Sequence, residues 1–217
     1  MKLKSYSTRI ATWALLAAAI PMLSGCFGAA ILGTGAGVLM ASDRRPAETY
    51  VTDEAIEVRA NDRIKDQFGD RVHVSVTSYD RSVLLVGEVP DAATRSAVEK
   101  VVSGVPNVKS ISNELMIAGA NSLSGESNDA YITTKVKARF VDANQFSANH
   151  VKVVTEAGVV YLLGIVTKRE ADEAVQIART TAGVMKVVRV FEIISEERAR
   201  QLDSSTAAST PPAPAKP

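Results

Sequence analysis

The sequence predicts an α+β protein made of two tandem αββαβ domains, each a small three-stranded mixed sheet packed on two helices. Two segments, 51–117 and 128–194, carry the same order of elements. In both, apolar residues first recur at every fourth position, as on one face of a helix, and then form short β-rich runs. A linker of small and polar residues, 118–127, separates the two segments. These observations favour duplication of one small fold over a single larger domain.

Short motifs recur between the two segments in the same order. The matched pairs are residues 64–68 with 136–140, 83–89 with 160–166, and 104–108 with 183–187. The separation between partners grows from 72 to 77 to 79 positions along the chain. This drift predicts two insertions in the second copy, a longer loop around 142–149 and extra residues after the second helix. Loops are where a duplicated fold tolerates insertions.

Each segment opens with a predicted helix. A side chain suited to an N-cap starts it, and apolar residues four positions apart mark its buried face. The caps and buried positions are Thr52 or Asp53 with Ile56, Ala60, Ile64 and Phe68 in the first segment, and Asn128 or Asp129 with Ile132, Val136 and Phe140 in the second.

A β-hairpin follows each first helix, with its turn at 79–82 in the first copy and at 156–158 in the second. The apolar runs 83–86 and 159–163 do not alternate with polar residues. Strands without alternation are typical of sheets covered on both faces. We therefore expect both faces of each sheet to be partly covered, with the partner domain as one cover.

A second helix and a last strand complete each copy. Asp91 opens this helix in the first copy, and Gly104 and Gly183 end the two second helices. The last strands are predicted near 108–117 and 187–194. Domains this small are marginally stable alone, so we expect the two to contact each other.

The N-terminal 25 residues, 1–25, have the pattern of a secretory signal peptide. Lys2, Lys4 and Arg9 precede a mostly apolar stretch, 10–23, and small residues follow it. This stretch is shorter than the roughly 20 apolar residues of a comfortable membrane span.

The stretch Leu23-Ser24-Gly25-Cys26 resembles the lipobox of bacterial lipoproteins. The resemblance implies acylation of the Cys26 thiol, cleavage before Cys26, and a lipidated flexible tether over 26–50. Phe27, rather than Asp, at the next position implies sorting to the outer membrane with the domains facing the periplasm. An uncleaved membrane helix carrying an ordinary apolar cysteine is the alternative, which the glycines between 28 and 37 disfavour.

The charge of the chain bears on which classes of partner it can bind. The formal net charge is +1, so no basic field over the whole chain points to nucleic acid. Segment 51–117 has eight Lys and Arg against eleven Asp and Glu, whereas 128–194 has nine against seven, so their net charges are −3 and +2.

Residues 195–217 are predicted to extend a helix and then, over 204–217, to form a disordered Pro/Ala/Ser tail. Trp13, in the signal, is the single tryptophan.

Two αββαβ repeats that each carry a V-x-L-x-G-x-V core and a later Gly-Val resemble BON domains. The cores here are Val83 to Val89, with Gly87, and Val160 to Val166, with Gly164. A lipobox followed by two such domains resembles the dual-BON-domain outer-membrane lipoproteins of the DolP type. The resemblance implies an attached periplasmic protein that binds phospholipid, supports outer-membrane integrity and is not an enzyme. Tyr131 departs from the pattern, because such proteins often carry Trp there.

The first helix of the second domain is the candidate contact with anionic phospholipid. Tyr131, Lys135 and Ala138 lie on the flank away from its apolar stripe, with Lys137 and Arg139 nearby. An aromatic ring with basic side chains on one helix suits the headgroup layer. The alternative is a protein-binding scaffold for an envelope assembly machine, without direct reading of lipid.

The sequence predicts no cofactor, no metal site and no catalytic group. No serine lies in a Gly-x-Ser-x-Gly pattern. The two histidines, His73 and His150, have no spacing typical of metal ligands and are expected to be surface or strand-end residues. The glycine-rich stretch 33–37 lacks the ending of a nucleotide-binding loop. The sequence sets no oligomeric state.

Overall fold

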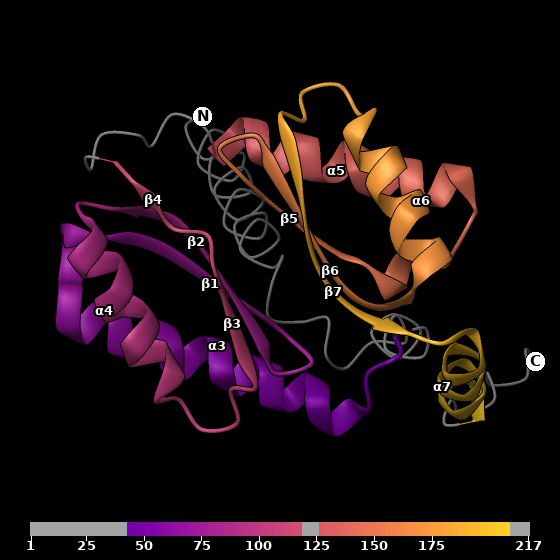
Figure 1. Ribbon diagram of the computed structural model, residues 1–217, viewed down its shortest axis with the longest axis horizontal. Helices are drawn as coiled ribbons and strands as arrows, with labels where there is room; N and C mark the ends of the chain where they lie inside the picture. The colour runs from indigo at the N-terminus through magenta and orange to yellow at the C-terminus, as the bar shows by residue number, and fades with distance from the viewer. Residues whose placement is uncertain (1–42, 119–125, 209–217) are drawn as a thin grey trace, which may run out of the picture. The chain divides into compact units, whose positions relative to one another are not determined.

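The computed structural model describes residues 43–118 and 126–208, which belong to one compact unit, Ala41–Pro217 (Figure 1). The predicted signal peptide and Cys26, the predicted lipidation site, lie outside the described residues. None of the helices in the described ranges combines the length and hydropathy that a membrane span needs.

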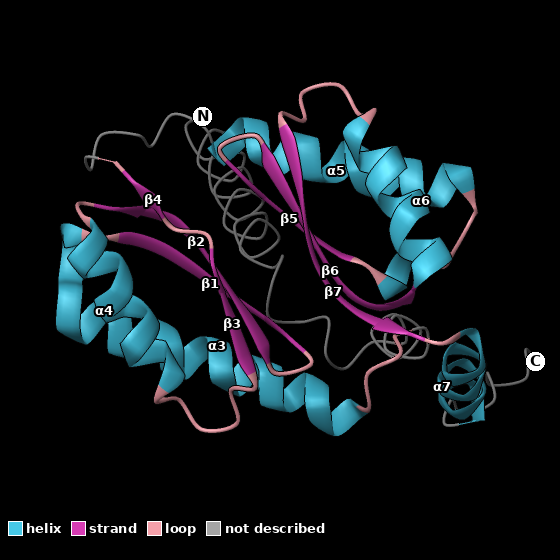
Figure 2. Cartoon of the chain, in the orientation of Figure 1, coloured by secondary structure: helices cyan, strands magenta, loops and turns pink. Residues whose placement is uncertain are grey.

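The first domain has two helices on one face of a mixed sheet (Figure 2). Its elements are α3 (Ala47–Phe68), a 3-10 turn (Gly69–Arg71), β1 (His73–Tyr79), β2 (Ser82–Val89), α4 (Ala92–Ser103), β3 (Ser110–Asn113) and β4 (Met116–Ile117). β1 pairs antiparallel with β2, and β2 pairs parallel with β3 and β4. β3 and β4 continue the same register, so they form one interrupted strand at the predicted position.

The second domain repeats this order. Its elements are α5 (Glu126–Ala143), a 3-10 turn (Ala148–His150), β5 (Lys152–Glu156), β6 (Val159–Thr167), α6 (Lys168–Arg179), β7 (Lys186–Ile194) and a further helix, α7 (Glu196–Ala208). β5 pairs antiparallel and β7 parallel with the central β6. The predicted α+β class with two αββαβ domains is confirmed.

Each domain has its own core between helices and sheet. The predicted stripes of both first helices are buried, and Ile56, Ala60, Val136 and Phe140 are fully inaccessible to solvent. Burial of such side chains contributes about 1.5–3 kcal/mol each for the larger ones.

A third buried cluster joins residues of both sheets. It contains Tyr79, Leu84, Val86, Tyr161, Leu163 and Ile165. Alternate residues of a strand face opposite sides, so the side chains of β2 and β6 that do not enter the helix-side cores enter this cluster. This explains why the apolar runs of the central strands do not alternate, and it confirms the predicted contact between the domains.

Asp53 and Asp129 are not the N-caps that the sequence predicted. α3 begins at Ala47 and α5 at Glu126, so both aspartates lie inside helices, and both are buried. Each carboxylate accepts two hydrogen bonds from the hairpin turn of its own domain. These bonds are Asp80 N and Arg81 N to Asp53, at 2.9 and 2.7 Å, and Ala157 N and Gly158 N to Asp129, at 2.7 and 2.9 Å.

These equivalent contacts correct the predicted register of the repeat. Asp53 and Asp129 are 76 positions apart and the turn residues Asp80 and Ala157 are 77 apart. The proposed match of 64–68 with 136–140 is therefore wrong by one helical turn. The predicted longer loop is present, because residues 144–151 connect α5 to β5 whereas only 69–72 connect α3 to β1. Most of this difference comes from an earlier end of α5, since only one residue is added between the aspartate and the hairpin turn. The two phenylalanines of that match are similar in sequence only.

The central strand of each domain contains a glycine at a position where no side chain would fit. A Cβ at Gly87 would lie 2.1 Å from the carbonyl oxygen of His73, and a Cβ at Gly164 would lie 2.3 Å from that of His150. Such distances are far inside van der Waals contact, so a side chain at either position would push the paired chain segments apart. The two histidines therefore occupy equivalent positions, 77 residues apart.

Two expected flexible segments are partly folded. The predicted tether, 26–50, includes the start of α3 and the buried side chain of Arg44. The predicted disordered tail, 204–217, includes the last turn of α7, where the Ser204 hydroxyl donates to the carbonyl of Gln201. Residues 209–217 lie outside the described part of the chain.

Candidate functional site

The outward face of α5 brings together three of the predicted contact residues. Tyr131 is 63% exposed, and Lys135 and Ala138 follow it by four and seven positions. At 3.6 residues per turn, these three side chains lie within about 60° of one another around the helix. The ammonium of Lys135 lies 5.0 Å from the centroid of the Tyr131 ring. This is cation–π distance, so the ring and the charge form one local unit.

Lys135 and Arg139 also join α5 to the end of α6. The Lys135 ammonium donates to the carbonyl of Ala182 at 2.6 Å, and Arg139 Nη1 donates to Ile177 O at 3.0 Å and to Thr181 Oγ1 at 2.8 Å. Cations stabilise the carbonyl-rich C-terminal end of a helix. Arg139 is half-buried there, so its guanidinium faces the neighbouring helix rather than the open face that carries Tyr131.

Lys137 is exposed but lies on a different flank. Six positions from Tyr131 place it about 120° away around the helix. Val141, which the sequence reasoning missed, is 65% exposed and lies on the same side as Lys137. Val141 is four positions from Lys137 and three from Ala138, so it lies next to both on the exposed surface of the helix. The face is therefore wider and more apolar than predicted.

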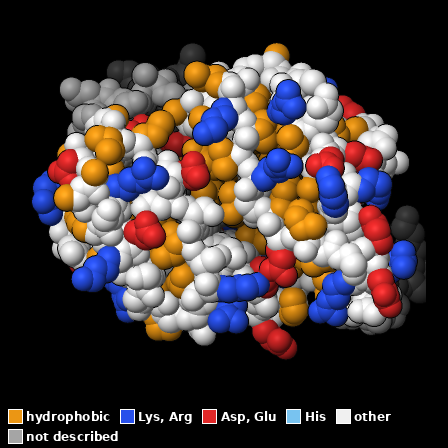
Figure 3. All heavy atoms as spheres, in the orientation of Figure 1, with side chains coloured by type: hydrophobic (Ala, Val, Ile, Leu, Met, Phe, Trp, Pro, Cys, Tyr) orange, Lys and Arg blue, Asp and Glu red, His pale blue; other side chains and the backbone are white. Residues whose placement is uncertain are grey.

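The face of the molecule shown in Figure 3 carries no field of a single charge. Basic, acidic and hydrophobic side chains are interspersed on this face. In the second domain, Met185, 80% exposed, and Ile193, 55% exposed, are further large apolar side chains at the surface. The face shown in Figure 3 is therefore mixed in charge, and the outward side of α5 is distinguished by the pairing of Tyr131 with Lys135.

A buried polar cluster that the sequence reasoning missed lies where the chain enters the first domain. The Arg44 guanidinium contacts Glu170 and Asp203 at 2.7 and 2.8 Å and donates to the carbonyl of Ile165. Next to it, Arg45 pairs with Asp43 and Asp53, and its guanidinium stacks 3.9 Å from the centroid of the Tyr79 ring. The signal in the sequence is the pair Arg44-Arg45 directly before a helix.

The charges of this cluster act on Glu170. Burial by itself would raise the pKa of the Glu170 carboxyl, but its contacts with His150 and Arg44 outweigh burial and hold that pKa well below its ordinary value. His150, expected at the surface, is buried, and its Nδ1 lies 3.8 Å from a Glu170 oxygen, beyond hydrogen-bond range. Within the described residues this nitrogen makes no hydrogen bond.

Comparison with known proteins places this fold in a family. Residues 52–119 and 128–195 each match the BON domain. The chain is 34% identical to outer membrane lipoprotein DolP of Haemophilus influenzae over 183 residues, which cover 83% of this chain and 95% of that protein.

Two other relatives are similar over shorter stretches. The 21 kDa hemolysin of Actinobacillus pleuropneumoniae is 33% identical, over 70% of this chain and 79% of its own. Osmotically-inducible protein Y of Escherichia coli is 30% identical, over 70% of this chain and 78% of its own. The domain matches cover most of the chain and coincide with the two αββαβ units. The chain therefore belongs to the BON-domain family and carries two copies of the domain in tandem.

Proposed function

We propose that this chain is a lipid-anchored protein of the outer membrane, facing the periplasm, whose second BON domain contacts anionic phospholipid through α5. The observation that carries the proposal is the pairing of an exposed Tyr131 with the Lys135 ammonium on the more basic of the two domains. The lipobox at Cys26 and the similarity to a protein named outer membrane lipoprotein support the anchor and the location.

The chemistry of this face suits the boundary between headgroups and acyl chains. A tyrosine ring is apolar with one polar end, and it is favoured at membrane interfaces. A lysine near an anionic surface adds about 1 kcal/mol of attraction. Ala138 and Val141 continue the face with small or apolar side chains that present no charge to the bilayer. Lys137 adds a second ammonium at its edge.

The anchor and the helix have different roles in this proposal. Acyl chains on Cys26 hold the protein at the bilayer, because two or more chains give stable anchoring. The α5 face, which is small, binds reversibly and sets how the domains approach the lipid. Arg139, committed to α6, keeps the helix in place and does not itself need to meet a phosphate.

Vesicle binding by a soluble form tests the proposal. This form spans residues 27–217, since it must begin before Asp43 to keep the buried Arg44 contacts. We expect it to sediment with phosphatidylglycerol vesicles and less with phosphatidylcholine vesicles. Tyr131→Glu is expected to abolish sedimentation and Lys135→Glu to weaken it. Val58→Glu, at a 52% exposed apolar position on α3 of the first domain, is the matched control and is expected to bind normally.

A protein-binding scaffold is the second candidate, and exposed apolar residues away from α5 favour it. Met185 and Ile193 in the second domain and Ile117 in the first are such residues. If Tyr131→Glu leaves both vesicle binding and envelope integrity unchanged, the scaffold is the better account. If Met185→Glu instead disturbs envelope integrity while vesicle binding persists, a protein partner at that surface is indicated.

A further inference from the structure

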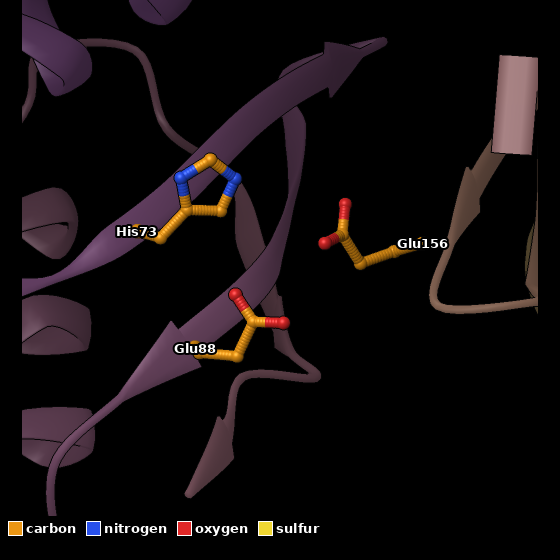
Figure 4. Close-up of side chains that lie close together, drawn as sticks. All are labelled: His73, Glu88 and Glu156. Carbon is orange, nitrogen blue, oxygen red and sulfur yellow. The ribbon is translucent and has the colours of Figure 1, made fainter. Parts of the chain in front are cut away.

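We propose that His73, Glu88 and Glu156 form a site for a divalent first-row transition-metal ion such as Zn²⁺. The three side chains converge (Figure 4). Each can offer one ligand atom, an imidazole nitrogen or a carboxylate oxygen, and these atoms all lie within 4.8 Å of one another. The site is separate from the α5 face and does not depend on the proposed lipid contact.

The pairing of β1 with β2 brings His73 and Glu88 together. They are direct partners in the antiparallel register of β1 and β2, so their side chains stand on the same face of the sheet. Leu84 and Val86 precede Glu88 at alternate positions of β2, and both enter the buried cluster shared by the two sheets. Glu88 therefore lies at the end of an apolar row and is only 7% exposed.

Glu156 is supplied by the second domain. It is the last residue of β5 and directly precedes the turn at Ala157 and Gly158. The Asp129 carboxylate binds both backbone N–H groups of that turn, so the position of Glu156 is fixed by a buried contact. A preorganised turn lowers the cost of presenting its neighbour as a ligand.

The ligand types and charges of this cluster suit a bound cation. A buried carboxylate is costly unless a positive charge or hydrogen bonds compensate it, and Glu88 and Glu156 bring two carboxylates to one place. One imidazole and two carboxylates match the ligand types of zinc sites, whereas calcium and magnesium sites use oxygen alone. Three protein ligands leave a fourth tetrahedral position for water.

The observed spacing is close to what a bound ion needs. Ligand atoms about 2.1 Å from a tetrahedral zinc lie roughly 3.4 Å apart. Small side-chain rotations of exposed His73 and half-buried Glu156 would close the remaining distance around Glu88. Because His73 and Glu88 belong to the first domain and Glu156 to the second, a bound ion would also hold the two domains together.

Metal titration of the purified mature chain, without a histidine tag, tests the site. Isothermal titration calorimetry with ZnCl₂ is expected to give one ion per chain, and CoCl₂ is expected to give visible absorption bands of a four-coordinate site. His73→Ala and Glu156→Gln are each expected to weaken Zn²⁺ binding by about tenfold or more. Binding should also weaken as the solution is made acidic, because protons compete with the metal for its ligands.

Two controls separate the loss of a metal ligand from a general effect of substitution on the fold. Glu54→Gln removes an exposed carboxylate of α3 and is expected to bind Zn²⁺ like the unchanged chain. Circular dichroism spectra of the variants should match that of the parent, since His73 and Glu156 lie at strand ends rather than in a core. Absence of stoichiometric Zn²⁺ binding, or equal binding by His73→Ala and the parent chain, would overturn the proposal.

Discussion

Arg44 and Glu170 lie 126 positions apart in the sequence and form a buried two-point ion pair, with Nη1 to Oε2 at 2.7 Å and Nη2 to Oε1 at 3.0 Å. Asp203 and the carbonyl of Ile165 accept the remaining N–H groups, so all five donors of the guanidinium are used. Arg44, which precedes the first domain, therefore binds the second domain through Glu170 and Ile165 and binds α7 through Asp203.

Removing this guanidinium should be costly. Arg44→Ala leaves the Glu170 carboxylate buried without its partner, and loss of one partner of a buried pair costs about 3–5 kcal/mol. We expect the free energy of unfolding, measured with urea on residues 27–217, to fall by that amount. Lys168→Ala removes a solvent-exposed pair with Asp172 and should change it by less than about 0.5 kcal/mol. Equal effects from the two variants would contradict the assignment.

Because of Glu170, the free energy of unfolding should decrease as the pH falls into the acid range. Its pKa is lowered on folding, so its contribution is complete above the unfolded pKa of about 4.3 and is lost as pH falls toward the lower folded value. Glu170→Gln retains the capping contact with Thr167 but carries no charge. The free energy of unfolding of this variant is expected to be lower at neutral pH and to decline less between about pH 5 and pH 3. Parallel curves for the two proteins would refute the role given to the carboxylate.

The hairpin turn of the second domain offers a stabilising change. Ala157 and Gly158 both have positive φ, 48° and 75°, as in a type I′ turn, which prefers Asn-Gly. Alanine is strained in this region whereas asparagine tolerates it. Ala157→Asn should therefore raise the free energy of unfolding by about 0.5–1 kcal/mol. Asp129→Ala, which removes the acceptor for both turn N–H groups, should lower it by more than about 1 kcal/mol. A destabilised Ala157→Asn chain would show that the turn is not type I′.

The same contact shows what the sequence could and could not predict. The helices and the hairpins were predictable, because the buried stripe of a helix and a turn between β-rich runs are local patterns. The partner of Asp53 was not, because the carboxylate meets a turn 27 or more positions away. An aspartate near a helix start was therefore interpreted as a cap.

The sequence alignment of the two copies was wrong in the first helix because similar residues occur one turn apart. Phe68 and Phe140 end comparable stripes, but the contacts of Asp53 and Asp129 place them one helical turn out of register. Arg44 was missed for a related reason, since its carboxylate partners lie more than a hundred positions away. Of the candidate contact residues, helix periodicity alone was enough to place Tyr131, Lys135 and Ala138 on one face. The engagement of Arg139 with α6 required the tertiary structure.

Tyr161 provides a probe of the buried cluster shared by the two sheets. Burial raises the pKa of Tyr161 to about 12, and the carboxylates of Glu114 and Glu156 add to this effect. Because its neutral form is favoured on folding, its contribution to stability is complete below the unfolded pKa of about 10 and is lost as pH rises through 12. In a titration of tyrosinate absorbance, Tyr161→Phe should remove a step near pH 12. Loss of a step near pH 10 instead would mean that this side chain is solvated.

The most direct test of the account is whether position 131 enters the headgroup layer. The single tryptophan, Trp13, lies in the predicted signal, so a Tyr131→Trp form of residues 27–217 carries one tryptophan reporter. With phosphatidylglycerol vesicles, its emission should shift to the blue and be quenched by brominated acyl chains, whereas a Tyr50→Trp control on α3 of the first domain should show neither change. Unshifted, unquenched emission from the Tyr131→Trp form in the presence of these vesicles would contradict the proposed lipid contact.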